Sequence, residues 1–204
     1  TIPYNDKYSI IYMYTEAFGR ASYLVSRSRG KKSTVSKALF IPLSVLEMEV
    51  EHLNKRDLHR IKETRICFPL NDVCCDPVKN VLALFLSEVL FRVVKDTEPD
   101  PRLFDYLYES IHLLEYADKG IANFHMVFLL GLLHHLGIFP NMESHRVGYY
   151  FDMLNGVFTD HIPMHRHYLN KVESAFFSRL LRISFENMSL YGFSRQERAR
   201  IIHR

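Results

Sequence analysis

The sequence predicts an α+β protein in which a small antiparallel sheet or barrel precedes a set of helices. Segments rich in β-branched and aromatic residues fill the first third of the chain, and apolar residues then recur at three- and four-residue spacing. Charge divides at the same place, because residues 1–70 hold 12 Lys and Arg against 7 Asp and Glu, whereas the remainder holds 14 against 16. We therefore predict two domains, residues 1–70 and residues 71–204.

Four segments predict the strands of the sheet. They read YSIIYMYT (8–15), RASYLVS (20–26), KALFIPLSVLEMEV (37–50) and DLHRIKETRI (57–66). Their side chains favour a pleated, half-buried backbone, and EAFG and NKRD mark turns between them. Together they predict a small antiparallel sheet or barrel.

Helical patterns begin after FPLNDVCC, and each predicted helix has a start signal. The predicted helices cover residues 76–93, 100–116, 121–137 and 170–181, followed by a basic helix after Ser194. Asp76 and Asp100 each precede a proline, which predicts an N-cap and a proline at the first helical position. Capping boxes are predicted for the pairs Asn170–Glu173 and Ser194–Glu197. Apolar residues lie almost all round the first helix, so we expect it to be buried.

Cysteine and hydropathy patterns indicate the cellular compartment in which the protein is expected. Cys67, Cys74 and Cys75 are odd in number and two are adjacent, which predicts free thiols in a reducing compartment. The apolar run over residues 124–137 is too short to span a bilayer and contains histidines, so we expect no membrane helix. The absence of a signal-peptide pattern favours the cytoplasm.

Motifs for catalysis are incomplete. RGKKS lacks the glycine of a phosphate-binding loop, since Val25 stands at that position, and no nucleophile elbow, HExxH motif or local carboxylate pair is present. The best metal candidates are four histidines, His145, His161, His165 and His167. Pro163 disfavours a helix that would present two of them together. We predict neither an enzyme nor a bound cofactor.

A basic, acid-free stretch is the strongest functional signal. No Asp or Glu lies between Glu16 and Glu47. The basic residues of this stretch are Arg20, Arg27, Arg29, Lys31, Lys32 and Lys37, with Tyr12, Tyr14, Phe18 and Tyr23 on or beside the neighbouring strands. A positive groove with aromatic platforms is typical of proteins that hold single-stranded nucleic acid. The plainer alternatives are a solvated loop and aromatic residues that belong to the core.

Long segments carry a family resemblance. They include YNDKYSIIYMYTEAFGRASYLVSRSRGKKSTV, LHRIKETRI, DPVKNVLALFLSEVLFR, ANFHMVFLLGLLHHLGIFPN and YYFDMLNGVF, and they span nearly the whole chain. This combination resembles the RecO family of bacterial recombination mediators and DNA repair proteins, in the form found in Bacteroidetes.

The resemblance implies an N-terminal OB-fold barrel and a helical C-terminal domain. It also implies a protein without ATPase activity that binds single- and double-stranded DNA and anneals complementary strands. With RecR, such a protein helps RecA to load on DNA covered by single-strand-binding protein (SSB), whose acidic tail is a further partner. The DNA-binding surface of the family corresponds here to Arg20, Arg27, Arg29, Lys31, Lys32 and Lys37, and the expected location is cytoplasmic and nucleoid-associated.

Three departures from the family pattern lead to further expectations. Relatives begin about one strand before Thr1 and continue beyond Arg204, so we expect a barrel that lacks its first strand and has an open edge. Many relatives carry a four-cysteine zinc site where this chain has residues 142–165 without cysteine, which favours a metal-free variant with an ordered hydrophobic excursion. An arginine that contacts the SSB tail in some relatives is replaced by Asn123.

Two classes of function compete on the sequence alone. The preferred hypothesis is a non-enzymatic DNA annealing and mediator protein whose basic loop grips phosphates without reading bases. The alternative is a helical adaptor that binds proteins while its basic N-terminus is only a soluble surface. A metal-dependent hydrolase is a distant third.

Overall fold

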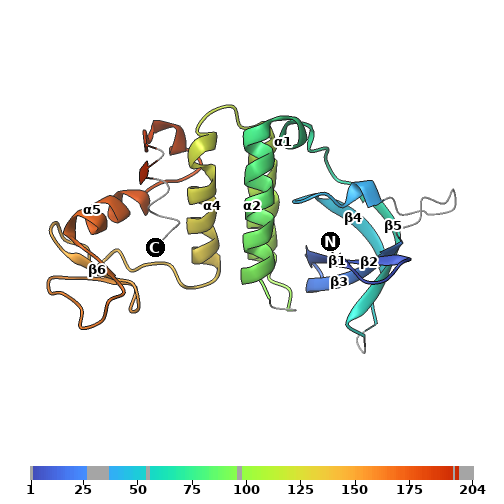
Figure 1. Cartoon of the computed structure of the whole chain (residues 1–204), viewed down its shortest axis with the longest axis horizontal. Coiled ribbons are helices and arrows are strands. Elements are labelled where there is room, and N and C mark those ends of the chain that lie inside the picture. Colours follow the sequence, from blue (N-terminus) through green and yellow to red (C-terminus); the bar gives the residue numbers. More distant parts are fainter. Residues whose placement is uncertain (1, 27–36, 54–55, 96–97, 195, 198–204) are drawn as a thin grey trace. The chain divides into compact units, whose positions relative to one another are not determined.

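The structure is a computed structural model that describes residues 2–26, 37–53, 56–95, 98–194 and 196–197. It confirms the predicted α+β class, with a sheet followed by helices (Figure 1). The chain divides into two compact units, which we call the N-terminal unit (Thr1–Tyr116) and the C-terminal unit (Ala117–Arg204). No helix within the described ranges is long and apolar enough to cross a membrane.

A five-stranded sheet forms the first part of the N-terminal unit. Its strands are β1 (Ile2–Pro3), β2 (Tyr8–Thr15), β3 (Gly19–Ser26), β4 (Leu46–Glu51) and β5 (Leu58–Ile66), in the order β1-β2-β3-β5-β4. Buried side chains on β2 and β3, among them Ile11, Tyr23 and Val25, form its core. Over the described residues no pairing joins β1 to β4, so the sheet is open, as expected, rather than a closed barrel.

The sheet is mixed, which corrects the prediction of a purely antiparallel one. β5 lies between β3 and β4, and the β3–β5 pair is parallel with Tyr23 opposite His59. The other pairs are antiparallel. Alternating hydrophobicity identifies strands but says nothing about the direction of the partner, so the sequence pattern could not reveal this crossover.

The third predicted strand is also shorter than expected. Of residues 37–50, only the last part belongs to β4, and the first part is a short 3-10 helix, η1 (Lys37–Leu39). Leu43 has a φ of 62°, next to Pro42, and this left-handed backbone cannot continue a strand. The apolar residues between them resemble a strand only in composition.

Three helices complete the N-terminal unit: α1 (Asn71–Cys75), α2 (Pro77–Val93) and α3 (Pro101–Tyr116). The Asp76 carboxylate accepts hydrogen bonds from the N–H groups of Val78 and Lys79, which confirms the predicted N-cap of α2. Asp100 caps α3 in the same way. Local signals were sufficient to place both helix starts.

The burial expected for α2 is found on one face only. Ala83 and Leu86 are buried, whereas Val81 is 64% exposed and Leu84 is 52% exposed. An apolar surface that extends round a helix indicates that several faces are able to pack, but it does not say which of them does. The prediction of a fully buried helix was therefore wrong.

Buried charge connects the three helices. The Glu115 carboxylate of α3 accepts hydrogen bonds from the N–H groups of Asp72 and Val73 at the start of α1, which has no side-chain cap of its own. Lys79 of α2 is 5% exposed, and its Nζ donates to the Glu115 carbonyl oxygen at 2.6 Å. Its Nζ also lies 3.5 Å from an Asp72 carboxylate oxygen. We call Asp72, Lys79 and Glu115 the helix junction.

The C-terminal unit combines helices with a small sheet. Its helices are α4 (Ile121–His135) and α5 (Lys171–Leu180), with the short 3-10 helix η2 (Met188–Leu190). The strands β6 (Tyr150–Asp152), β7 (Val157–Thr159) and β8 (Tyr168–Leu169) form an antiparallel sheet in the order β7-β6-β8. The predicted capping boxes are present: Asn170 and Glu173 bond reciprocally at α5, as do Ser194 and Glu197. The basic helix predicted beyond them falls largely outside the described residues.

Candidate nucleic-acid interface

The predicted basic stretch begins on β3 and continues past it. Arg27, Arg29, Lys31 and Lys32 lie outside the described residues, so their predicted role stays a prediction. Lys37 opens η1, where its backbone is described and its side chain is not. Of the six predicted DNA-binding residues, Arg20 alone has a described side chain.

Arg20 connects β3 to the end of α2. Its Nη1 donates hydrogen bonds of 2.8 Å to the carbonyl oxygens of Phe91 and Val94. The guanidinium carbon lies 4.8 Å from the centroid of the Phe91 ring and 5.2 Å from that of the Tyr12 ring. A helix C-terminus carries partial negative charge and unpaired carbonyls, so a cation there is favourable. This geometry gives Arg20 a structural partner within its own unit.

The aromatic residues near the basic stretch divide between core and surface. Tyr23 is fully buried, and Phe18 stacks on His52 with a centroid distance of 3.8 Å. The Tyr14 hydroxyl lies 3.3 Å from the Asp100 nitrogen, which donates to it. Tyr12 is 36% exposed, and its ring packs edge-on against Phe91. Of these four aromatic rings, Tyr12 is the one exposed for stacking on a base.

The outer face of β4 and β5 carries basic residues that acidic residues neutralise. Arg65 donates two hydrogen bonds to the Glu47 carboxylate, at 2.8 and 2.6 Å, and these bonds, with the positive charge, lower the pKa of Glu47. Lys62 Nζ lies 3.3 Å from a Glu49 carboxylate oxygen. We call these four residues the charge ladder. Paired in this way, they offer a phosphate backbone little net positive charge.

The described histidines of the C-terminal unit do not assemble a metal centre. No group of three His, Cys, Asp or Glu side chains within the described ranges is placed to hold a metal ion. His161 bonds to Asp160, His145 packs edge-on against Phe158, and the rings of His165 and His167 are 6.3 Å apart.

Asp152 is the polar centre of the small C-terminal sheet. Its carboxylate accepts hydrogen bonds from the N–H groups of Leu154 and Asn155 and from the Asn155 amide, and His165 Nε2 lies at 3.1 Å. Burial alone would raise the pKa of Asp152, but these hydrogen bonds outweigh it and lower the pKa. Side-chain hydrogen bonds thus close the β6–β7 hairpin.

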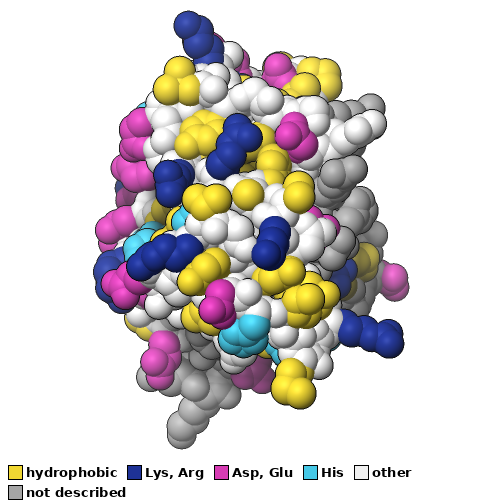
Figure 2. Space-filling model, turned by 90° about the vertical axis from the view of Figure 1, so that its left-hand side faces the viewer, with side chains coloured by type: hydrophobic (Ala, Val, Ile, Leu, Met, Phe, Trp, Pro, Cys, Tyr) yellow, Lys and Arg dark blue, Asp and Glu magenta, His cyan; other side chains and the backbone are white. Residues whose placement is uncertain are grey.

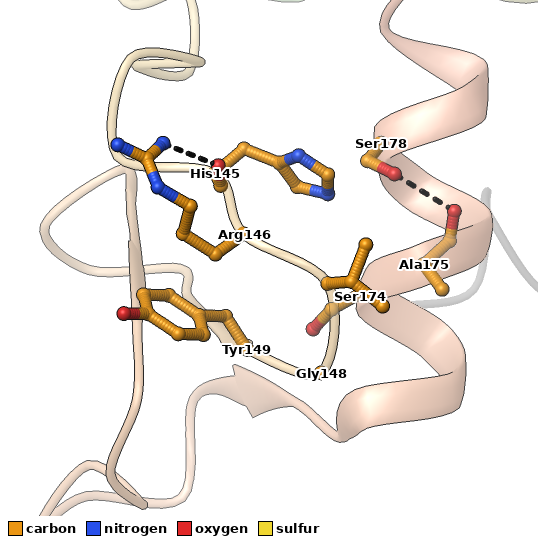
Figure 3. A pocket seen from close by; sticks show the side chains of 8 residues that line it. His145, Arg146, Gly148, Tyr149, Ser174, Ala175 and Ser178 are labelled. Carbon is orange, nitrogen blue, oxygen red and sulfur yellow. Dashed lines mark hydrogen bonds between the residues drawn. The ribbon is translucent and has the colours of Figure 1, made fainter.

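A small cleft of about 90 Å³ lies between the segment before β6 and α5 (Figure 3). It is lined by His145, Arg146, Val147, Gly148, Tyr149, Ser174, Ala175 and Ser178. Arg146 Nη1 already donates to the His145 carbonyl, and the Ser178 hydroxyl donates to the Ala175 carbonyl.

Figure 2 shows Lys and Arg side chains scattered among acidic and hydrophobic ones on the face of the molecule that it views. The described side chains of that face therefore form no continuous basic patch.

Asn123 has a structural role at the start of α4. It is 4% exposed, and its amide nitrogen donates to the carbonyl oxygens of Met188 and Tyr191, at 2.9 and 2.7 Å. Gly120, with a φ of 75°, precedes the helix, and a Cβ there would lie 2.8 Å from a Met188 side-chain atom. The η2 segment therefore packs closely over this helix start, and position 123 is enclosed.

Comparison with known proteins identifies the class first. The relatives are DNA repair proteins: one from Azobacteroides pseudotrichonymphae is 40% identical over 98% of this chain and 83% of its own length, and one from Bacteroides fragilis is 42% identical over 98% and 84%. A relative from Flavobacterium psychrophilum is 33% identical over 97% of this chain and 82% of its own length.

Two family models then specify the group within that class. Recombination protein O N terminal matches residues 1–70, and Recombination protein O C terminal matches residues 75–202. This chain belongs to the RecO family, and its role is in DNA repair and recombination.

Proposed function

We propose that this chain is a non-enzymatic DNA-binding mediator. In this proposal it binds single- and double-stranded DNA and anneals complementary strands. With RecR it promotes RecA loading on SSB-coated single strands. Residues 1–70 serve as an OB-type DNA-binding domain and residues 71–204 as the helical domain, and the protein works in the cytoplasm on nucleoid DNA.

The observation that carries the proposal is the separation of two kinds of positive charge in the N-terminal unit. Arg65 and Lys62 on the charge ladder have acidic partners. The stretch between Glu16 and Glu47 contains no acidic residue in its own sequence. Phosphates attract clustered cations, and the acid-free sequence provides such a cluster, so the proposed contacts are Arg27, Arg29, Lys31, Lys32 and Lys37.

Arg20 is proposed to contribute less to DNA binding than the other five basic residues of the acid-free stretch. Two of its donor bonds go to carbonyls at the end of α2, and its guanidinium lies over the rings of Tyr12 and Phe91. Its role in this proposal is mainly to hold the sheet against α2, which fixes the strand from which the basic loop departs.

Annealing follows from contacts to phosphate alone. Lys and Arg release counterions from the backbone and provide affinity without reading bases, so two strands held in this way still slide into register. No catalytic group is required. The proposed protein partners are RecR and the SSB tail, and because Asn123 is enclosed, the tail contact is proposed to lie elsewhere on the helical domain.

A salt series tests the proposal. Binding of a labelled single-stranded oligonucleotide is followed by fluorescence anisotropy between about 50 and about 300 mM salt. The test variant carries R27E, R29E, K31E and K32E. The matched control carries K119E, R166E, K171E and R182E, which change the net charge equally at residues of the C-terminal unit that are exposed in the structure.

The wild-type chain and the control are expected to bind with a steep loss of affinity as salt rises, and the test variant at least about tenfold more weakly. Equal binding by the test variant would move the DNA site away from this loop. Absence of binding by the wild-type chain would favour the helical adaptor.

A further inference from the structure

A column of stacked rings joins the two hairpin ends of the N-terminal sheet. The rings of Phe18 and His52 stack at 3.8 Å with an interplanar angle of 3°, and those of His52 and His59 at 3.9 Å and 18°. Tyr23 continues the column, with its ring centroid 5.9 Å from that of His59. Phe18 belongs to the turn between β2 and β3, and His52 to the loop between β4 and β5. The column therefore fastens one hairpin end to the other.

A hydrogen bond fixes the protonation state of His59. The Leu53 N–H donates to His59 Nδ1 at 3.4 Å, so this nitrogen carries no proton and the ring is neutral. Leu53 also accepts a hydrogen bond from the Arg56 N–H at 2.9 Å. His59 itself is 6% exposed. The start of the β4–β5 loop thus depends on a buried neutral imidazole.

We propose that the Phe18–His52–His59 stack is an acid-sensitive latch, and that protonation of His59 releases the backbone of Leu53 just after β4. A proton on Nδ1 turns the acceptor of the Leu53 N–H into a second donor, and the hydrogen bond is lost. The same proton places a charge in a buried stack with another imidazole as its neighbour. Because the Arg56 N–H donates to the Leu53 carbonyl oxygen, release of Leu53 also displaces this exposed cation.

The groups around His59 favour its neutral form. Burial lowers the pKa of His59 and nearby His52 lowers it further, while Asp57 acts in the opposite direction. Tyr23 of β3 presents a buried hydroxyl for which the described residues provide no hydrogen-bond partner, and Phe18 of the β2–β3 turn is uncharged. Glu51 and Arg60 are cross-strand partners of each other and are exposed to solvent.

The sign of the pH effect follows from this lowered pKa. When the Leu53 contact is open, the imidazole of His59 titrates near its ordinary value of about 6.5. Above that pH His59 is neutral in both forms and the Leu53 hydrogen bond is kept. As the pH falls below it, the open form binds the proton first, so the opening equilibrium rises by up to about tenfold per pH unit. This rise ends when the pH reaches the pKa of the closed form.

Amide hydrogen exchange by NMR tests the latch in the full chain. The protection factor of the Leu53 amide, corrected for intrinsic exchange, is measured between about pH 7.5 and about pH 5. It is expected to fall by up to about tenfold per pH unit below about 6.5, while the Leu107 amide of α3 keeps its protection. A Leu53 protection factor that does not change with pH would overturn the proposal. An equal loss of protection at the Leu107 amide would overturn it too.

Two variants separate the roles of the rings. H59Q keeps an acceptor without a titrating group, so its Leu53 protection should not change with pH. H52F keeps the ring stack but removes the second imidazole that lowers the pKa of His59, so its Leu53 amide should lose protection at lower pH than that of the wild type. H167Q, at an exposed histidine of the C-terminal unit, is the control and should match the wild type. If H59Q fails to fold, an unchanged opening midpoint in H52F rejects the latch.

Discussion

Two sets of charged residues in the N-terminal unit show opposite uses of the same chemistry. In the helix junction Lys79 and Glu115 are buried, at 5% and 4% exposure, while the Asp72 side chain is 63% exposed, and the buried groups bond mainly to backbone. In the charge ladder, the Arg65 side chain is 74% exposed and pairs with a carboxylate. Buried charge is expensive to leave unpaired, whereas exposed pairs are screened by water and salt. The junction therefore specifies how the helices pack, and the ladder mainly sets the surface potential.

The helix junction should give the largest effect on stability. E115A leaves the Asp72 and Val73 N–H groups without an acceptor and removes a buried carboxylate from the helix junction. We expect the free energy of unfolding to fall by about 3 kcal/mol, measured by urea denaturation. E109A, at an exposed site on the same helix, should change it little. Equal losses in both variants would contradict the comparison.

Arg20 should come next, because it is a half-buried cation that bonds to backbone carbonyls at the end of α2. R20A removes two hydrogen bonds to α2 carbonyls and the stacking on Phe91, so we expect a loss of about 1–2 kcal/mol. R92A is the matched control, since that side chain is 75% exposed and pairs with Glu88 on the same helix. If R20A leaves stability unchanged and weakens DNA binding as much as the loop variant, Arg20 is primarily a phosphate contact.

Asp152 extends the comparison to the C-terminal unit, because its contribution to the stability of the fold depends on pH. Its pKa is lower in the folded protein than in the unfolded chain, so the unfolded chain binds a proton more readily as the pH falls. The stabilisation from Asp152 is thus complete above about pH 5 and is lost as the pH falls through about 4 and below. In thermal unfolding across this range, D152N should depend less on pH than the wild type. D118N, at an exposed aspartate, should follow the wild type.

Helix starts could be predicted because their signals are local. Asp76, Asp100 and Asn170 each accept hydrogen bonds from N–H groups two and three residues ahead, a pattern that is visible in the sequence itself. The β6–β7 hairpin was missed, although Asn155-Gly156 is a strong turn signal and Gly156 has a φ of 66°. Its three-residue strands are too short for alternation to identify them.

The candidate site shows the limit of such reasoning. Composition identifies a set of cations, but it does not identify their partners. Arg20 bonds to Phe91, which lies 71 residues away, and only the fold brings them together. The histidine stack did have a sequence signal, since His52 and His59 flank the predicted NKRD turn as cross-strand neighbours do.

The smallest effect is expected at the charge ladder, where it tests which cations matter for DNA. E47Q combined with E49Q removes the partners of Arg65 and Lys62 without changing side-chain size. Because both pairs are exposed, we expect no measurable change in the midpoint of urea unfolding. DNA affinity at low salt should rise by no more than about threefold, because two cations become available to phosphate. E98Q combined with E109Q is the control for net charge. The gain in DNA affinity of this variant is compared with the loss caused by R27E, R29E, K31E and K32E. If the two changes are equally large, the charge ladder rather than the acid-free stretch is the main DNA surface.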